Sequence, residues 1–445
     1  MTLLVPTEIF QPRLTTDRDA ATSFRLGKLA CGGPRYQSLR MNLRLCARLI
    51  TLLVFLMTNG PFAAAQATPD PKPTAGPPHD PETEVAFDHF YNMDYVRATE
   101  ALEKIVAKHP DDAFSVNHLL TVVLMRDLYE TGAMNTGDYT NDSFIGRAPR
   151  PTDRKIKDRI KELAHRALSL EEKQLKANPT DVNALYCRGV TRADFAVYTG
   201  LVERAWFSAL RNAVGARHDH ERVLELDPSF SDAKMVVGTH NYVAGNLPWS
   251  LKVAAALAGL NGSKDRGLTY LREVAKSNGE ASTDAKVILS LFLRREHKYD
   301  EAIGYMQELT AKYPGNHLFP TEVANLQRSA GQLSEAEVEY RKVWQNGREG
   351  KYGKLHYELA AWGLGELLRS KKDLAGAAAA YELVNEAPNP DPDIRQKANL
   401  AAGEMYDLLE KRDLAMKAYE AVLTGRADSG QADQARRFMK EAYRE

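Results

Sequence analysis

One spacing of small and large apolar residues recurs along this 445-residue chain and constrains its fold. The clearest copy lies between His297 and Pro314, where Ala302 is followed by Met306, Leu309 and Pro314. Residues three and four positions apart lie on one face of an α-helix, so each copy predicts a helix with one buried face. Whole or partial copies occur at Ala336/Tyr340/Val343, Ala377/Tyr381/Val384, Ala415/Tyr419/Val422 and Ala98/Leu102/Ile105/Pro110, with weaker ones at Ala167/Pro179 and Ala216/Val223/Pro228.

The spacing is typical of the second helix of a helical hairpin. A small residue lets this helix approach the first one, the large residue four positions later fills the gap, and proline ends the helix. The first helices carry small residues of their own, Gly365 before Leu368 and Gly403 before Tyr406. From Glu84 onward the pattern is helical, without the sustained alternation of strands, and predicts an all-α fold.

These residues resemble the tetratricopeptide repeat (TPR) family, whose unit is a helix-turn-helix of about 34 residues. Ala302 and Ala336 are 34 residues apart, whereas the steps to Ala377 and Ala415 are longer. The resemblance implies an α-solenoid of TPR-type helix hairpins with irregular insertions, in which stacked units bury each other's apolar faces. We expect a first TPR-like unit at 84–130, a loop insertion at 131–153, degenerate TPR-like helices at 154–260, a TPR array at 261–429 and a capping helix at 430–445.

The first 83 residues do not fit this pattern. Residues 41–67, MNLRLCARLITLLVFLMTNGPFAAAQA, combine basic residues, a short apolar run and a small-residue cleavage zone, as a secretory signal does. We expect cleavage near Ala65 or Ala67, with an uncleaved membrane anchor as the alternative, and 1–40 as an upstream extension. Residues 68–83 are a proline-rich linker. The predicted location is the periplasm or cell envelope.

Charge balance, cysteine content and the 131–153 loop limit the kinds of function that the sequence predicts. Residues 1–67 hold eight basic and three acidic side chains of a chain with 59 of each, so the rest is slightly acidic and does not predict nucleic-acid binding. Cys31 and Cys46 lie in the leader, which leaves Cys187 alone, without a disulfide partner and as a small buried residue. Asp138 and Asp142 in the 131–153 loop lack the glycine and the terminal glutamate of a calcium loop.

The segment LAGLNGSKDRG, residues 257–267, invites comparison with a phosphate-binding loop. Such a loop follows a strand and ends in Gly-Lys-Ser/Thr, whereas this segment follows an alanine-rich helical stretch and has the order Gly-Ser-Lys. We therefore predict a turn between helices, with Gly267 as the small packing residue, Leu271 as the large one and Lys264 merely exposed. Residues 238–276 also resemble a stretch of a eukaryotic TPR-like family implicated in inclusion-body clearance, which implies an adaptor without catalytic residues.

No metal, cofactor or catalytic set emerges from the sequence. His218 and His220 lie two positions apart, so on a helix they point to different sides and do not share a metal. His220 occupies the large packing position of a degenerate repeat, and His240 is isolated. No catalysis is expected; the alternative is an enzyme whose site lies within the irregular 111–260 region.

Arg294, Arg328 and Arg369 fall at the same repeat position, with Asn325 and Trp362 on the same surface. Such a row of guanidinium groups suits bidentate contact with carboxylates, although Asp407 replaces arginine in the last unit. It resembles the carboxylate-binding grooves of TPR domains without their full set of clamp residues; the alternative is a row paired with nearby Glu and Asp. We predict an exported scaffold for a protein or peptide partner that carries carboxylates. An envelope-assembly or lipid-associated adaptor, bound through the N-terminal segment, is the alternative, and the oligomeric state stays open.

Overall fold

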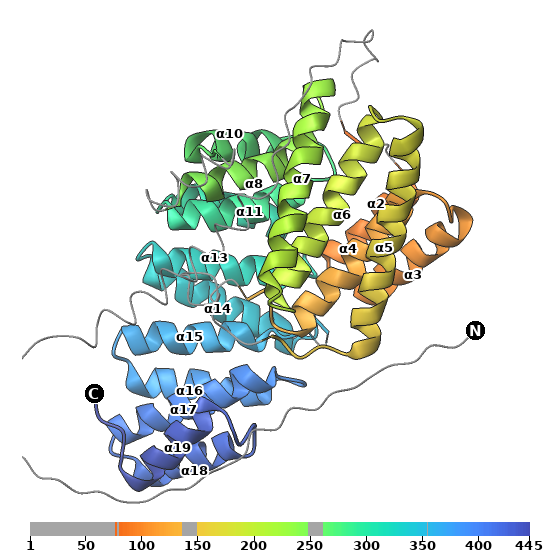
Figure 1. Cartoon of the computed structure of the whole chain (residues 1–445). Helices are drawn as coiled ribbons and strands as arrows, with labels where there is room; N and C mark the ends of the chain where they lie inside the picture. The colour runs from red at the N-terminus through yellow and green to blue at the C-terminus, as the bar shows by residue number, and fades with distance from the viewer. Residues whose placement is uncertain (1–75, 78–79, 136–148, 248–260, 354) are drawn as a thin grey trace, which may run out of the picture. The chain divides into compact units, whose positions relative to one another are not determined.

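The computed structural model describes residues 76–77, 80–135, 149–247, 261–353 and 355–445 (Figure 1). Within these ranges every regular element is a helix, which confirms the predicted all-α class. The predicted upstream extension, the signal or anchor and residues 68–75 and 78–79 of the linker lie outside the described residues. The α-helices are α2 (Pro81–Tyr91), α3 (Tyr95–Lys108), α4 (Ala113–Glu130), α5 (Arg154–Ala177), α6 (Val182–Leu201), α7 (Trp206–Leu226), α8 (Lys234–Gly245), α10 (Lys264–Ala275), α11 (Ser282–Arg295), α12 (Tyr299–Lys312), α13 (Leu318–Ser329), α14 (Leu333–Arg348), α15 (Glu358–Ser370), α16 (Leu374–Leu383), α17 (Pro392–Leu408), α18 (Arg412–Leu423) and α19 (Gly430–Lys440), with two short 3-10 turns, η4 (Ser231–Ala233) and η5 (Val384–Glu386).

The first described helix begins inside the segment predicted as linker. Asp80 accepts hydrogen bonds from the main-chain N–H groups of Glu82 and Thr83. Pro81 occupies the first helical position, where its missing N–H costs nothing. A proline-rich composition therefore marked a helix start here, because proline suits the first turn of a helix.

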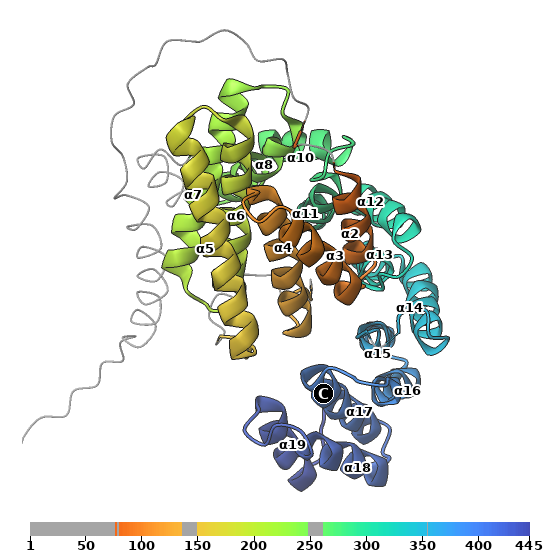
Figure 2. The ribbon, with the colours of Figure 1, turned by 90° about the vertical axis from the view of Figure 1, so that its right-hand side faces the viewer.

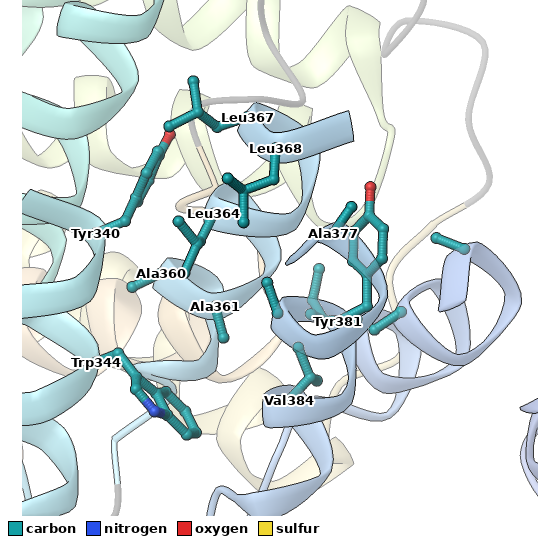
Figure 3. Packing of buried hydrophobic residues seen from close by; sticks show 14 of the residues in the cluster. Tyr340, Trp344, Ala360, Ala361, Leu364, Leu367, Leu368, Ala377, Tyr381 and Val384 are labelled. Carbon is teal, nitrogen blue, oxygen red and sulfur yellow. The ribbon is translucent and has the colours of Figure 1, made fainter. Parts of the chain in front are cut away.

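Consecutive helices pack as hairpins, α11 with α12 through α17 with α18, and α19 ends the array (Figures 1 and 2). The predicted packing residues are buried: Ala336, Tyr340 and Val343 have no exposed surface, and neither do their counterparts in α16 with η5 and in α18. Figure 3 shows this packing between α14, α15 and α16, with Tyr340 and Tyr381 on either side of α15. A β-carbon at Gly365 would overlap the ring of Tyr381, so the small residue is required by the contact.

Most hairpin turns share one backbone conformation. The second residue after the first helix has a positive φ, 56° at His297, 80° at Gly331, 61° at Lys372 and 59° at Glu410. The next N–H then reaches back to the helix end, as in the bond from Asp373 N to Leu368 O. This geometry satisfies carbonyl groups that the helix end leaves free, and it fixes a tight turn.

The degenerate region keeps the hairpin contact in a different form. α5, α6 and α7 have 24, 20 and 21 residues and are longer than the array helices. A β-carbon at Gly189 in α6 would overlap the fully buried His220 of α7, which is the glycine-and-ring contact of the array. Cys187 of α6 is buried, as predicted. The predicted 131–153 loop lies between α4 and α5, and its residues Asp138 and Asp142 lie outside the described ranges, as do 248–260.

Residues of the first units contact the beginnings of the array helices. The Tyr91 hydroxyl donates to Asp284 in the first turn of α11 (3.2 Å), and the Asn316 amide donates to the Tyr91 carbonyl (2.8 Å). The Tyr129 hydroxyl accepts from the His356 N–H (2.7 Å), just before α15, and lies 3.1 Å from His317 Nε2. The N-terminal hairpins therefore abut one end of α11, α13 and α15. Among the described helices, none is both long and apolar enough to cross a membrane.

Candidate functional site

The predicted arginines lie at the other end of the same helices. Arg294, Arg328 and Arg369 occupy the last turns of α11, α13 and α15, where a cation complements the helix dipole. We call the surface formed by these arginines together with Asn325 and Trp362 the arginine face. Its five residues come from three successive first helices, as the repeat spacing predicts.

Arg294 is held by the next unit. Its Nη1 donates to Glu322 Oε1 of α13 at 3.2 Å, and the two side chains are only 15% and 8% exposed. Asn325 links this pair to the hairpin core, because its amide donates to Glu322 (3.0 Å) and its carbonyl accepts from the Tyr340 hydroxyl (2.6 Å). Burial raises the pKa of Tyr340 to about 12, so this hydroxyl stays protonated and donates. Asn325 is thus a structural link between three helices.

Arg369 is held in the same manner. Its Nη1 donates to Glu404 of α17 at 2.8 Å, and its Nη2 donates to the Tyr443 hydroxyl at 3.2 Å. Burial raises the pKa of Glu404, and the guanidinium beside it opposes that shift. Arg294 and Arg369 therefore follow the alternative in which the row pairs with nearby carboxylates.

Arg328, between them, differs. Its side chain is half-buried, and it forms no hydrogen bond or ion pair with any residue of the described ranges. Trp362 of α15, seven residues before Arg369, is also half-buried, and its ring lies 5.3 Å from that of Tyr381. The Tyr381 hydroxyl donates to Glu366 at 2.6 Å. The middle of the arginine face therefore offers one guanidinium and an indole edge.

The sequence did not identify Glu322 and Glu404 as partners. Each carboxylate comes from the next first helix, and the two occupy different positions in their units, six residues before Arg328 and three before Asp407. A search for residues at one repeat position therefore finds the arginines but not their acids. The binding role of the arginine face stays a prediction, now centred on Arg328.

The phosphate-loop candidate is a helix start. Ser263 caps α10, Gly267 packs against the main chain of Gly238 and Tyr242 in α8, and Leu271 is fully buried. The interpretation of Lys264 as merely exposed needs correction, because its ammonium group lies 2.6 Å from Glu296 and makes an ion pair. The described part, 261–267, therefore leads into a helix packed on α8, with Gly267 and Leu271 in their predicted packing roles, and residues 257–260 lie outside the described ranges.

In the described part of the 111–260 region, one histidine and one charged cluster lie at the contact between α6 and α7. The His220 Nδ1 donates to the Ala216 carbonyl (2.8 Å), and burial lowers the pKa of His220 to about 4, whereas His218 is exposed. Arg188 and Arg192 of α6 both bind Asp219 of α7. A hollow of about 290 Å³ in this region contains none of these groups and is lined by Asp111, Leu170, Lys173, Gln174 and Ala177.

A larger hollow of about 480 Å³ lies away from the arginine face, between α10, α11 and α12. Its lining carries charges of both signs: Lys286 lies 2.8 Å from Glu308, Arg272 holds Glu301 at 2.6 Å, and Lys276 and Asp300 also line it. The hollow therefore does not present charge of a single sign to a ligand.

Comparison with known proteins supports the repeat assignment. A tetratricopeptide repeat family model matches residues 254–317, which include α10, α11 and α12. A search of curated proteins finds no match. Solved structures that the chain matches include yeast Tom70 (14% identity over 81% of this chain and 87% of that chain, TM-score 0.38), PilF of Pseudomonas aeruginosa (15%, 57% and 97%, 0.34) and a tetratricopeptide repeat protein from Parabacteroides merdae (14%, 75% and 97%, 0.31). Overlaps with scores this low do not identify a common ligand or activity.

Proposed function

Because this chain is a tetratricopeptide-repeat protein, we propose that it is an exported scaffold that binds a segment of a protein partner through Arg328 on the arginine face. The observation that supports this site is the difference between three arginines at one repeat position. Arg294 and Arg369 already hold carboxylates of the chain, whereas Arg328 holds none among the described residues. A partner carboxylate would form with Arg328 the ion pair that Arg294 and Arg369 form with carboxylates of the chain itself.

The chemistry of the surroundings favours a peptide over a small molecule. Arg328 lies on an open helical face between Asn325 and the unit that carries Trp362, and an extended segment contacts several first helices of a repeat array at once. A guanidinium offers two parallel N–H groups to one carboxylate, and a charge-assisted hydrogen bond of this kind contributes about 1.5–3 kcal/mol. Loss of the anchor should then weaken binding by roughly 10- to 100-fold.

The test compares Arg328→Ala with Arg341→Ala. Arg341 lies on the exposed side of α14 and pairs only with Glu337, one turn earlier in the same helix, among the described residues. A tagged wild-type chain captures partners from an envelope extract, and the dissociation constant of each purified partner is then measured for both variants. We expect Arg328→Ala to lose affinity with an unchanged melting temperature, and Arg341→Ala to bind as the wild type. Equal affinities for all three chains would refute the anchor.

Export rests on the residue pattern at 41–67, which lies outside the described residues. N-terminal sequencing of the mature protein tests it, with a start at Gln66 or Thr68 as the expected result. A chain that keeps Met41 and sediments with membranes after a salt wash would favour the lipid-associated adaptor. A chain that keeps Met41 and stays in the cytosolic fraction would contradict export.

A further inference from the structure

The last residues of the chain lie against the end of the arginine face. α19 ends at Lys440, and Glu441 is extended, with φ −136° and ψ 120°. The main-chain N–H of Tyr443 donates to Asp407 Oδ2 at 2.8 Å, its hydroxyl accepts from Arg369 at 3.2 Å, and its ring meets Phe438 edge-on at 5.1 Å. Figure 2 shows the C-terminal end beside α17. The segment 441–445, which we call the tail, thus contacts both α15 and α17.

Asp407 makes this contact possible. It occupies the position that holds arginine in the three preceding units, and its side chain is only 1% exposed. It accepts from Arg412 (2.8 and 3.0 Å), from the Tyr419 hydroxyl (2.8 Å) and from the Tyr443 N–H. An arginine there has no acceptor atom and could not hold a main-chain N–H. The last unit therefore binds a peptide group where the earlier units present a cation.

We infer that the surface formed by Arg369 and Asp407 is a binding site for an extended, tyrosine-containing peptide segment, and that the tail occupies this site in the free chain. A main-chain N–H bonded to Asp407 fixes the position of such a segment, and a ring hydroxyl bonded to Arg369 selects tyrosine. These are the elements by which extended peptides are recognised, main-chain bonds for affinity and a side-chain contact for specificity. The segment that would displace the tail has the same chemistry and belongs to a protein partner.

The contacts of the tail suit exchange. Arg444 and Glu445 are exposed. Apart from the bond from the Glu441 N–H to the Arg437 carbonyl at the helix end, the tail is held to the described residues by two hydrogen bonds and one ring contact, all made by Tyr443. A tethered segment competes with a free peptide at an effective concentration in the millimolar range, so even weak contacts keep the site filled. The inference extends the proposed function, because the site adjoins Arg328 along the same face and would take a further part of an extended partner.

The experiment uses a fluorescent peptide of sequence KEAYRE, residues 440–445, and measures its anisotropy with the full-length protein. The wild type should bind it weakly, because the tethered tail competes. Tyr443→Ala weakens the tethered tail and should bind the peptide at least about 10-fold more tightly. Arg444→Ala changes an exposed neighbour in the same tail and should behave as the wild type. The same peptide with alanine in place of tyrosine should not bind any of the chains.

Equal affinity of wild type and Tyr443→Ala for the peptide, or no binding by the variant, would overturn the inference. Tyr443→Phe guards against misfolding, because it keeps the ring on Phe438 and removes only the hydroxyl; it too should bind more tightly than the wild type, by roughly 3-fold or more. This outcome is separate from the test of the anchor. Partner loss in Arg328→Ala together with equal peptide affinities would refute the occupied site and leave the proposed function intact.

Discussion

Gly365 allows a quantitative test of the packing that stacks the array. Alanine at this position adds a β-carbon that overlaps the fully buried ring of Tyr381, so the ring must move by roughly 1 Å to reach ordinary contact. That movement disturbs the ring contact with Trp362 and the 2.6 Å hydrogen bond to Glu366. Overpacking of this kind costs about 1–3 kcal/mol, and the better helix propensity of alanine offsets about 1 kcal/mol. We expect Gly365→Ala to lower the free energy of unfolding by up to about 2 kcal/mol.

Gly304 in α12 is the matched control. It is also inside an array helix, but in the described part of the chain nothing lies within 4 Å of the position that a β-carbon would take there. Gly304→Ala should therefore raise the free energy of unfolding by about 0.5–1 kcal/mol. Thermal unfolding followed by circular dichroism measures both, since 1 kcal/mol shifts the midpoint by about 2–4 °C for a cooperative unit of about 150–250 residues. A rise in midpoint for both variants would refute the close approach of α15 and α16.

Two further predictions concern turns and buried acids. Lys372 and Gly331 both have positive φ, 61° and 80°, which glycine adopts more easily than other residues. Lys372→Gly should therefore raise the free energy of unfolding by about 1 kcal/mol, and Gly331→Ala should lower it by about 1 kcal/mol, as measured by urea titration. Shifts of the same sign would contradict the turn geometry. Burial raises the pKa of Asp194 to about 7, from an ordinary value of 3.8. Because the pKa is higher in the folded than in the unfolded chain, the wild type is most stable below the unfolded-state pKa and loses stability as the pH rises through about 7. Asp194→Asn should therefore have the same free energy of unfolding as the wild type near pH 4, and a free energy of unfolding roughly 2–4 kcal/mol higher at pH 8. A difference independent of pH would show that Asp194 is not the titrating group.

The helical hairpins could be predicted because their packing depends on local spacing. An alanine and a tyrosine four residues apart, as at Ala377 and Tyr381, lie on one helix face whatever the rest of the chain does. The repeat then requires a small residue on the facing helix, and Gly365 supplies it. The same logic extended to the degenerate region, where His220 takes the place of tyrosine.

The contacts between units far apart in the sequence could not be predicted in this way. Tyr129 lies 188 residues from His317 and 227 from His356, and no spacing rule connects them. The tail had one sequence signal, the change from arginine to Asp407. Its meaning depended on knowing that the chain turns back after α19, which composition does not show.

The pairing of the arginines also determines how selective the arginine face can be. A partner carboxylate that displaced Glu322 from Arg294 would break an ion pair whose acid is only 8% exposed, and breaking a buried pair costs about 3–5 kcal/mol. That cost exceeds the about 1.5–3 kcal/mol that a new charge-assisted bond returns. The same holds at Arg369, whose partner Glu404 is 12% exposed. If the proposed function holds, carboxylates are therefore directed to Arg328 alone, and a partner with an acidic residue there gains nothing from acids at the neighbouring positions. We thus predict that the partner carries a single acid at a fixed position, and not an acidic segment in general.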